Sequence, residues 1–287
     1  MALRPCAFVV QPRAPCSETV RARRGARAYD HGAMTYDLLL LAAVPLVGFV
    51  SGFVNTLAGS GSLITLPLLI VLGLPANVAN GTNRVGILVQ CVVSVATFRR
   101  RGALPRASVL RILAPSVLGA AVGAELAAEL DEALLRRTIG VLMLVMLAVV
   151  LFRSRRWLES HASGRPANAW LQAAIFFAIG VYGGFIQAGV GIFLLAGLVL
   201  GAGYELVGGN AVKNLIVLVF TIAALAVFVV NDQVRWGLGA LLAAGSAAGA
   251  WAAAHFAVER GAPFVRAVLI AILILSAAAL LGDFRLV

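Results

Sequence analysis

Long apolar runs with few charges recur along the chain at nearly regular intervals. We predict that about eight of them form helices of roughly 20 residues, the length that crosses the hydrocarbon core of a membrane. Most of the arginines lie between these runs or in the first 33 residues. The predicted spans are residues 37–57, 78–98, 109–126, 138–152, 170–188, 207–230, 236–258 and 264–281.

Two shorter apolar runs each follow a break that contains glycines. The first break, residues 59–62, precedes the run 63–74, and the second, residues 189–191, precedes the run 192–203. Irregular backbone at membrane depth is tolerated only where protein buries it or where it lines a wet cavity. The two breaks are therefore the leading candidates for a substrate site.

The broken segments belong to a pattern that recurs after about 130 residues. The motif GFVN at residues 52–55 is echoed by GFIQ at residues 184–187. An interrupted hydrophobic segment that occurs twice indicates a transporter site at a repeat interface. We therefore predict an all-α integral membrane protein with two homologous halves, residues 36–152 and 170–287, joined by a cytoplasmic linker at residues 153–169.

Composition points to the lipid bilayer as the main partner. The chain of 287 residues is 61% hydrophobic and 12% charged, and its mean hydropathy of +0.98 excludes a soluble domain. The net charge of +11 does not indicate nucleic acid, because the arginines gather in the tail and loops without a basic helix. By the positive-inside rule, the basic loops near residues 99–106 and 153–165 face the cytoplasm.

The short runs admit two topologies. If they are re-entrant, both basic loops lie on one side and the halves share one orientation. If each is a full crossing, the halves are inverted. Each run has only about 12 apolar residues, which is short for a span. We therefore expect re-entrant segments and halves of equal orientation.

Residues 1–35 differ from the rest of the chain. They are rich in arginine and poor in acids, like a transit peptide, but lack a clear amphipathic period and an apolar core long enough for a secretory signal. We expect a disordered extension or a mis-assigned start, with Met34 as the alternative first residue.

Charged residues inside the predicted spans are few. Arg84 is the only arginine placed well inside a span, and Lys213 is the only lysine in the chain. An ionisable residue in a bilayer costs several kcal/mol unless it faces a cavity or a partner; the alternative is that both side chains snorkel to the interface. Because basic residues and amide donors occur together with no acid in mid-span, we predict a site for an anion.

Backbone N–H groups at the glycine breaks are the second set of candidate ligands. Free N–H groups at a helix start attract anions, although glycines at such positions also serve close helix packing. The predicted substrate-binding residues are Asn55, Gly59, Ser60, Gly61, Ser62, Asn80, Thr82, Asn83, Arg84, Gln187, Gly189, Gly191, Asn210, Lys213 and Asn214.

Motifs for chemical catalysis are missing from the sequence. It contains no HExxH, no metal-binding spacing of Cys and His, and no phosphate-binding glycine loop of the Walker type. Cys6, Cys16 and Cys91 form no disulfide framework. We therefore expect no catalytic residues, no metal and no cofactor, and a protein that is not an enzyme.

The segment GFVNTLAGSGSLITLPLLIVLGLPANVANGTNR at residues 52–84, with its weaker second copy ending GGNAVKN, resembles the TauE/SafE family of sulfite exporters and probable anion permeases. The resemblance covers residues 36–284. It implies a multi-pass protein of the bacterial inner membrane that exports or imports sulfite, a sulfonate or a related sulfur-containing anion. The second copy departs from the family pattern, because Gly197 stands where a proline is expected.

Three functions remain open from the sequence. The first is a secondary transporter that rocks its halves about a central site and is coupled to a proton or sodium gradient. The second is an anion channel that uses the same residues as a filter. The third is a non-transporting membrane subunit that anchors a partner complex.

Overall fold

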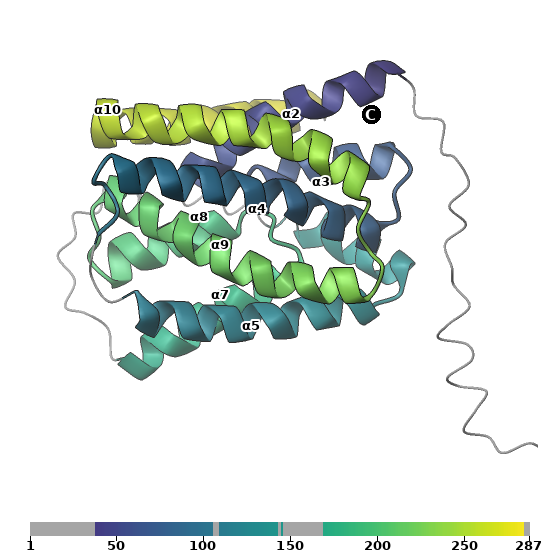
Figure 1. Ribbon diagram of the computed structural model, residues 1–287, viewed down its shortest axis with the longest axis horizontal. Coiled ribbons are helices and arrows are strands. Elements are labelled where there is room, and N and C mark those ends of the chain that lie inside the picture. Colours follow the sequence, from purple (N-terminus) through teal and green to yellow (C-terminus); the bar gives the residue numbers. More distant parts are fainter. Residues whose placement is uncertain (1–37, 106–108, 143–144, 146–168, 284–287) are drawn as a thin grey trace, which may run out of the picture. The chain divides into compact units, whose positions relative to one another are not determined.

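The computed structural model describes residues 38–105, 109–142, 145 and 169–283, and all regular structure in them is helical (Figure 1). The predicted extension at residues 1–35, most of the linker at 153–169 and the end of the fourth predicted span lie outside the described residues. Most helices begin and end within about three residues of the predicted spans. The fourth helix begins at residue 132, six residues before its predicted start, and α10 covers the seventh and eighth predicted spans with a break at Gly261. They are α2 (Leu38–Ala58), α3 (Ser62–Val71), α4 (Ala76–Arg100), α5 (Leu110–Glu129), helical residues 132–142, α7 (Ala169–Phe185), α8 (Val190–Ala196), the π-helical η1 (Gly197–Gly201), α9 (Leu206–Val230) and α10 (Trp236–Asp283).

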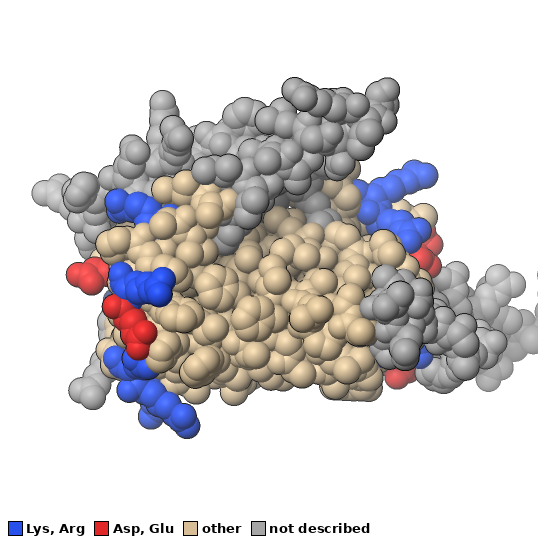
Figure 2. All heavy atoms as spheres, turned by 90° about the horizontal axis from the view of Figure 1, so that it is seen from above, with Lys and Arg blue, Asp and Glu red and all other residues tan. Residues whose placement is uncertain are grey.

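The lengths and exposed faces of these helices are those of a membrane protein. Four of them are long and apolar enough to cross a bilayer, namely Ala76–Arg100, Arg111–Glu129, Leu206–Val230 and Trp236–Val268. Mid-helix side chains such as Val92, Leu118 and Ile222 are exposed although they are apolar. Figure 2 shows an uncharged face between charged groups at either end. An all-α membrane protein is thereby confirmed.

Helices distant in sequence pack together as two bundles. The first bundle consists of α2, α3, α4 and α10, and the second of α5, α7, α8, η1 and α9, which lie above and below one another in Figure 1. Glycines permit the closest approaches: a Cβ on Gly52 would lie 2.3 Å from the Ser246 carbonyl oxygen, and one on Gly184 would lie 2.0 Å from that of Ala120. Each bundle therefore combines helices from both predicted halves.

The helices that begin the two predicted halves run in opposite directions. Pro45 and Phe49 of α2 contact Gly245 and Gly249 of α10 in the same order along both helices, so α2 and α10 are parallel. Val85 and Arg101 of α4 contact Gly239 and Glu259 of α10 in the same order, so α4 is parallel to α10 as well. Ser116 and Ala120 of α5 contact Gly180 and Gly184 of α7 in the same order, so α5 and α7 are parallel. A short turn joins α9 to α10, so these two helices are antiparallel. The end of α5 meets that turn through Ala128 and Gln233, so α5, α7 and α9 share one direction.

The expectation of equal orientation is therefore wrong. The physical reason lies in α3, which turns back and is joined to the start of α4 by only four residues. The pair α2–α3 thus begins and ends at the same end of the first bundle, so it does not count as a crossing. Opposite directions of α2 and α7 are the arrangement found in transporters with inverted repeats.

The central helices of the two bundles are α4 and α9. Residues 76–87 of α4 are all buried, and so are the polar residues of the second and third turns of α9. Both helices follow a broken segment, and the bundles meet along them. The fold therefore places the polar residues predicted from the sequence where the two bundles touch.

Candidate functional site

The two glycine breaks meet backbone to backbone. The Gly191 N–H donates to the Gly59 carbonyl oxygen at 3.3 Å. A Cβ on Gly59 would lie 2.2 Å from the Gly191 Cα, and Gly59 has a φ of +75°, which only glycine adopts without strain. Residues 132 positions apart in sequence are thus brought into direct contact.

Arg84 lies on α4 but binds the end of α7. Its guanidinium is fully buried and donates from Nη1 to the Gln187 Oε1 at 3.0 Å and to the Gly183 carbonyl at 3.3 Å. Its Nη2 donates to the carbonyls of Gly183 and Gly184. One turn earlier, the Asn80 Nδ2 donates to the Phe185 carbonyl at 2.7 Å. The Arg84 guanidinium also lies over the Phe228 ring, 4.9 Å from its centroid.

Lys213 lies on α9 but binds the end of α2. Its ammonium is fully buried and donates to the carbonyls of Asn55 at 3.1 Å and Thr56 at 2.7 Å. The neighbouring Asn214 Nδ2 donates to the same Thr56 carbonyl at 3.1 Å. The Asn55 carbonyl also accepts the N–H of Gly59 at 2.8 Å, so Lys213 is anchored at the break itself. Neither Arg84 nor Lys213 snorkels, because both side chains point into the protein.

Other predicted site residues hold the surrounding helices. The Asn55 Nδ2 donates to the Gln90 Oε1 at 3.0 Å, and the Gln187 Nε2 donates to the Thr221 Oγ1 at 2.9 Å. Neither Gln90 nor Thr221 was predicted as a site residue. The position of each polar side chain in the middle of an apolar span could have indicated it.

Asn83 and Thr82 have structural partners of different kinds. Asn83 accepts from the Thr65 Oγ1 at 2.6 Å and donates to the Ser62 Oγ at 3.1 Å, so it fixes the start of α3 against α4. The Thr82 Oγ1 instead accepts the N–H of Arg235 in the turn before α10. Of the predicted residues, Thr82 is the one that the structure directs to this turn and not to the breaks.

Several buried polar groups have no hydrogen-bond partner in the described part of the chain. Asn210 is fully buried, and both its Nδ2 and its Oδ1 are unpartnered. It shares a face of α9 with Lys213 and Asn214, at i+3 and i+4. The Thr56 Oγ1, Asn80 Oδ1 and Arg84 Nε are also unpartnered. Buried polar atoms are nearly always satisfied in folded proteins, so these unpartnered groups require an explanation.

The start of α3 carries further buried donors without partners in the described structure. The N–H groups of Ser60, Gly61 and Ser62 donate to no acceptor among the described residues, whereas those of Leu63 and Ile64 bond back to residues 60 and 61. All three donors belong to buried residues. Three successive free N–H groups at a helix start can bind a negatively charged group.

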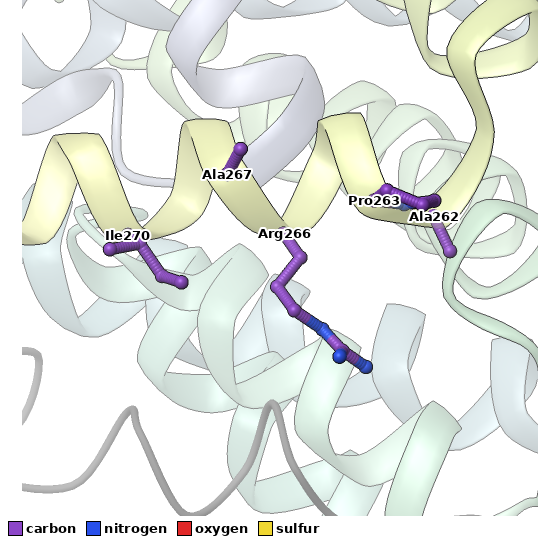
Figure 3. Close-up of a pocket in the computed structure, with 5 residues that line it drawn as sticks. All are labelled: Ala262, Pro263, Arg266, Ala267 and Ile270. Atoms are coloured by element: carbon purple, nitrogen blue, oxygen red, sulfur yellow. The ribbon is translucent and has the colours of Figure 1, made fainter.

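A cavity of about 330 Å³ lies beside α10 beyond its break at Gly261, and Figure 3 shows Arg266 extending from that helix among apolar neighbours. It contains none of the predicted site residues. Within the described ranges, no group of three His, Cys, Asp or Glu residues could hold a metal ion.

Comparison with known proteins places the chain in a family. Residues 44–280 match the family described as sulfite exporter TauE/SafE. A probable membrane transporter protein from Haemophilus influenzae is 28% identical over 81% of this chain and 91% of its own length. Similar proteins from Sinorhizobium sp. and Escherichia coli K12, both named probable membrane transporters, are 27% and 24% identical over 85% of this chain and cover 93% and 91% of their own lengths. No solved structure matches. The chain therefore belongs to the sulfite exporter TauE/SafE family of membrane transporters.

Proposed function

We propose that the protein is a secondary transporter for a small anion that binds where the two breaks meet. The observation that carries this proposal is the burial of two cations, Arg84 and Lys213, that contact neutral acceptors and no carboxylate among the described residues. A buried charge without a counter-charge is strongly unfavourable. A bound anion would neutralise it.

The helix dipoles do not remove this positive charge. The carboxyl end of α2 carries roughly half a negative charge, and the amino end of α3 just after it carries roughly half a positive charge. The two ends lie at the same break, so their fields largely cancel. The guanidinium and the ammonium remain as the net charge of the site.

Directional contacts would come from groups that still lack partners. The free N–H groups of Ser60, Gly61 and Ser62 and the Nδ2 of Asn210 are donors suited to oxyanion oxygens. Asn55, Asn80, Asn83, Gln187 and Asn214 hold the backbone and side chains around them. Gly59 and Gly191 supply the close backbone contact, and Gly189 precedes α8 with a φ of +73°.

The class of anion follows from the family and not from the geometry. The family description names sulfite, so we propose sulfite, a sulfonate or a related sulfur-containing anion as substrate. We further propose that a proton or sodium gradient drives the cycle, because no nucleotide-binding motif occurs in the sequence.

Charge at the two ends of the bundles supports one orientation in a bacterial inner membrane. At the end where α4 finishes, the described residues include six arginines and two acids: Arg99, Arg100, Arg101, Arg111, Arg260, Arg266, Glu205 and Glu259. At the other end they include three arginines and five acids: Arg136, Arg137, Arg235, Glu125, Glu129, Asp131, Glu132 and Asp232. We propose that the arginine-rich end faces the cytoplasm.

Counterflow in proteoliposomes tests the function. Vesicles loaded with unlabelled sulfite should accumulate external labelled sulfite transiently, and those loaded with an inert anion should not. Sulfate and a short alkyl sulfonate, loaded in parallel, would define the range of substrates. A flux that follows the electrochemical gradient without counterflow would make the protein a channel, and no flux of any of these anions would reject the proposal.

A further inference from the structure

The two buried cations both reach across the boundary between the bundles. Arg84 stands on α4 of the first bundle, and its acceptors lie at the end of α7 and in the break after it, in the second bundle. Lys213 stands on α9 of the second bundle, and its acceptors lie at the end of α2 in the first. The two contacts are thus crossed, and each also joins one predicted half of the chain to the other.

The groups that these cations bind are the last carbonyls of interrupted helices. The final turn of any helix leaves carbonyl oxygens without intrahelical partners. In a membrane no water is present to satisfy them. A cation at a carboxyl end supplies donors to these carbonyls. The amides of Asn80 and Asn214 support the two caps by donating to Phe185 and Thr56.

The two caps differ in strength. Arg84 donates to two carbonyls and to the Gln187 side chain and lies over the Phe228 ring. Lys213 donates to two carbonyls. The guanidinium is a planar fork with five donors, whereas the ammonium is a point charge with three. The end of α7 is therefore held by more contacts than the end of α2.

We propose that Arg84 and Lys213 are positioning residues, each of which caps and fixes the broken helix end of the opposite bundle. The caps set the place of Gly59 and Gly191, and through them the donors at the start of α3. Both side chains still supply the positive charge of the proposed anion site, but their hydrogen bonds go to backbone carbonyls next to the breaks. This inference concerns the protein without anion, so it does not depend on the identity of the substrate.

Hydrogen exchange measured by mass spectrometry on the full chain in lipid nanodiscs tests this inference. The measurement is made without added anion on the wild type and on Arg84→Gln, Arg84→Lys and Lys213→Gln. Arg100→Gln is the matched control, because Arg100 is exposed on the same helix as Arg84. Each variant is first checked for a monodisperse size-exclusion profile.

The expected pattern is crossed. Arg84→Gln should accelerate exchange about tenfold or more in residues 183–191, with little change in residues 55–62. Lys213→Gln should do the reverse, and Arg84→Lys should give a smaller acceleration than Arg84→Gln. The control should match the wild type. Unchanged exchange at both breaks, or equal acceleration everywhere, would overturn the inference. Failure of counterflow alone would leave it standing, since that result bears on the transport proposal.

Discussion

The contact between Gly59 and Gly191 allows a sharp test of the way the breaks meet. In Gly59→Ala, the new methyl would lie 2.2 Å from the Gly191 Cα, and the alanine would keep a φ of +75°. A positive φ costs an ordinary residue about 1–2 kcal/mol, and overpacking a tight contact typically costs about 1–3 kcal/mol. We therefore expect the folded state to lose about 2–5 kcal/mol and transport to be abolished.

Two other glycines separate these contributions. Gly191→Ala meets the same contact, at 2.4 Å from the Gly59 Cα, without a positive φ. Gly102→Ala has a φ of +69° but no neighbour within 4 Å, so it is destabilised by the backbone alone. Thermal unfolding of the purified variants and sulfite counterflow should both be worst for Gly59→Ala, and Gly102→Ala should transport normally. If Gly59→Ala and Gly102→Ala behaved alike, the close approach of the breaks would be refuted.

Three further changes probe the site, the moving parts and the orientation. Asn210→Ala should weaken anion binding by about tenfold because it removes an unpartnered buried donor, whereas the exposed Asn231→Ala should not; equal affinities would remove Asn210 from the site. Cysteines at Arg101 and Glu259, whose side chains meet at 3.2 Å, link two predicted halves within one bundle. Because each bundle holds helices from both predicted halves, we expect the bundles and not the halves to move as units. Bridging the two cysteines with a short bifunctional thiol reagent, in a chain without its native cysteines, should therefore preserve counterflow. Inhibition that reductant reverses would show that the halves move and not the bundles. In the same background, Arg100→Cys in intact cells should require a permeant maleimide and Ala133→Cys should not, and the opposite pattern would reverse the proposed orientation.

The helices were predictable because their signal is local. A run of about 20 apolar residues between arginine-rich loops specifies a span without knowledge of its neighbours. The breaks were predictable for the same reason, since glycines interrupt an otherwise continuous apolar pattern at residues 59–62 and 189–191. Arg84 and Lys213 were predicted as site residues because each lies beside Asn and Gly in a span that follows a broken segment, and both are buried.

The partners of these residues were not predictable from one sequence. Nothing in the pattern around Arg84 indicates that its acceptors are the carbonyls of residues 183 and 184 on another helix. Backbone acceptors carry no side-chain signature, so a cap made by a distant cation cannot be read from composition. The direction of α7 relative to α2 was predicted wrongly because the turn of α3 depends on packing against α4 through Asn83 and Thr65.

Equilibrium binding of labelled sulfite to the purified protein tests whether Arg84 and Lys213 create an anion site. We expect one saturable site in the wild type, and affinities lower by about ten- to a hundredfold in Arg84→Gln and in Lys213→Gln, since each loses a charged donor. Arg84→Lys should recover only part of the affinity because the planar fork is missing, and Arg100→Gln should bind like the wild type. Near-wild-type affinity in both glutamine variants would contradict the claim that these two buried cations create the anion site.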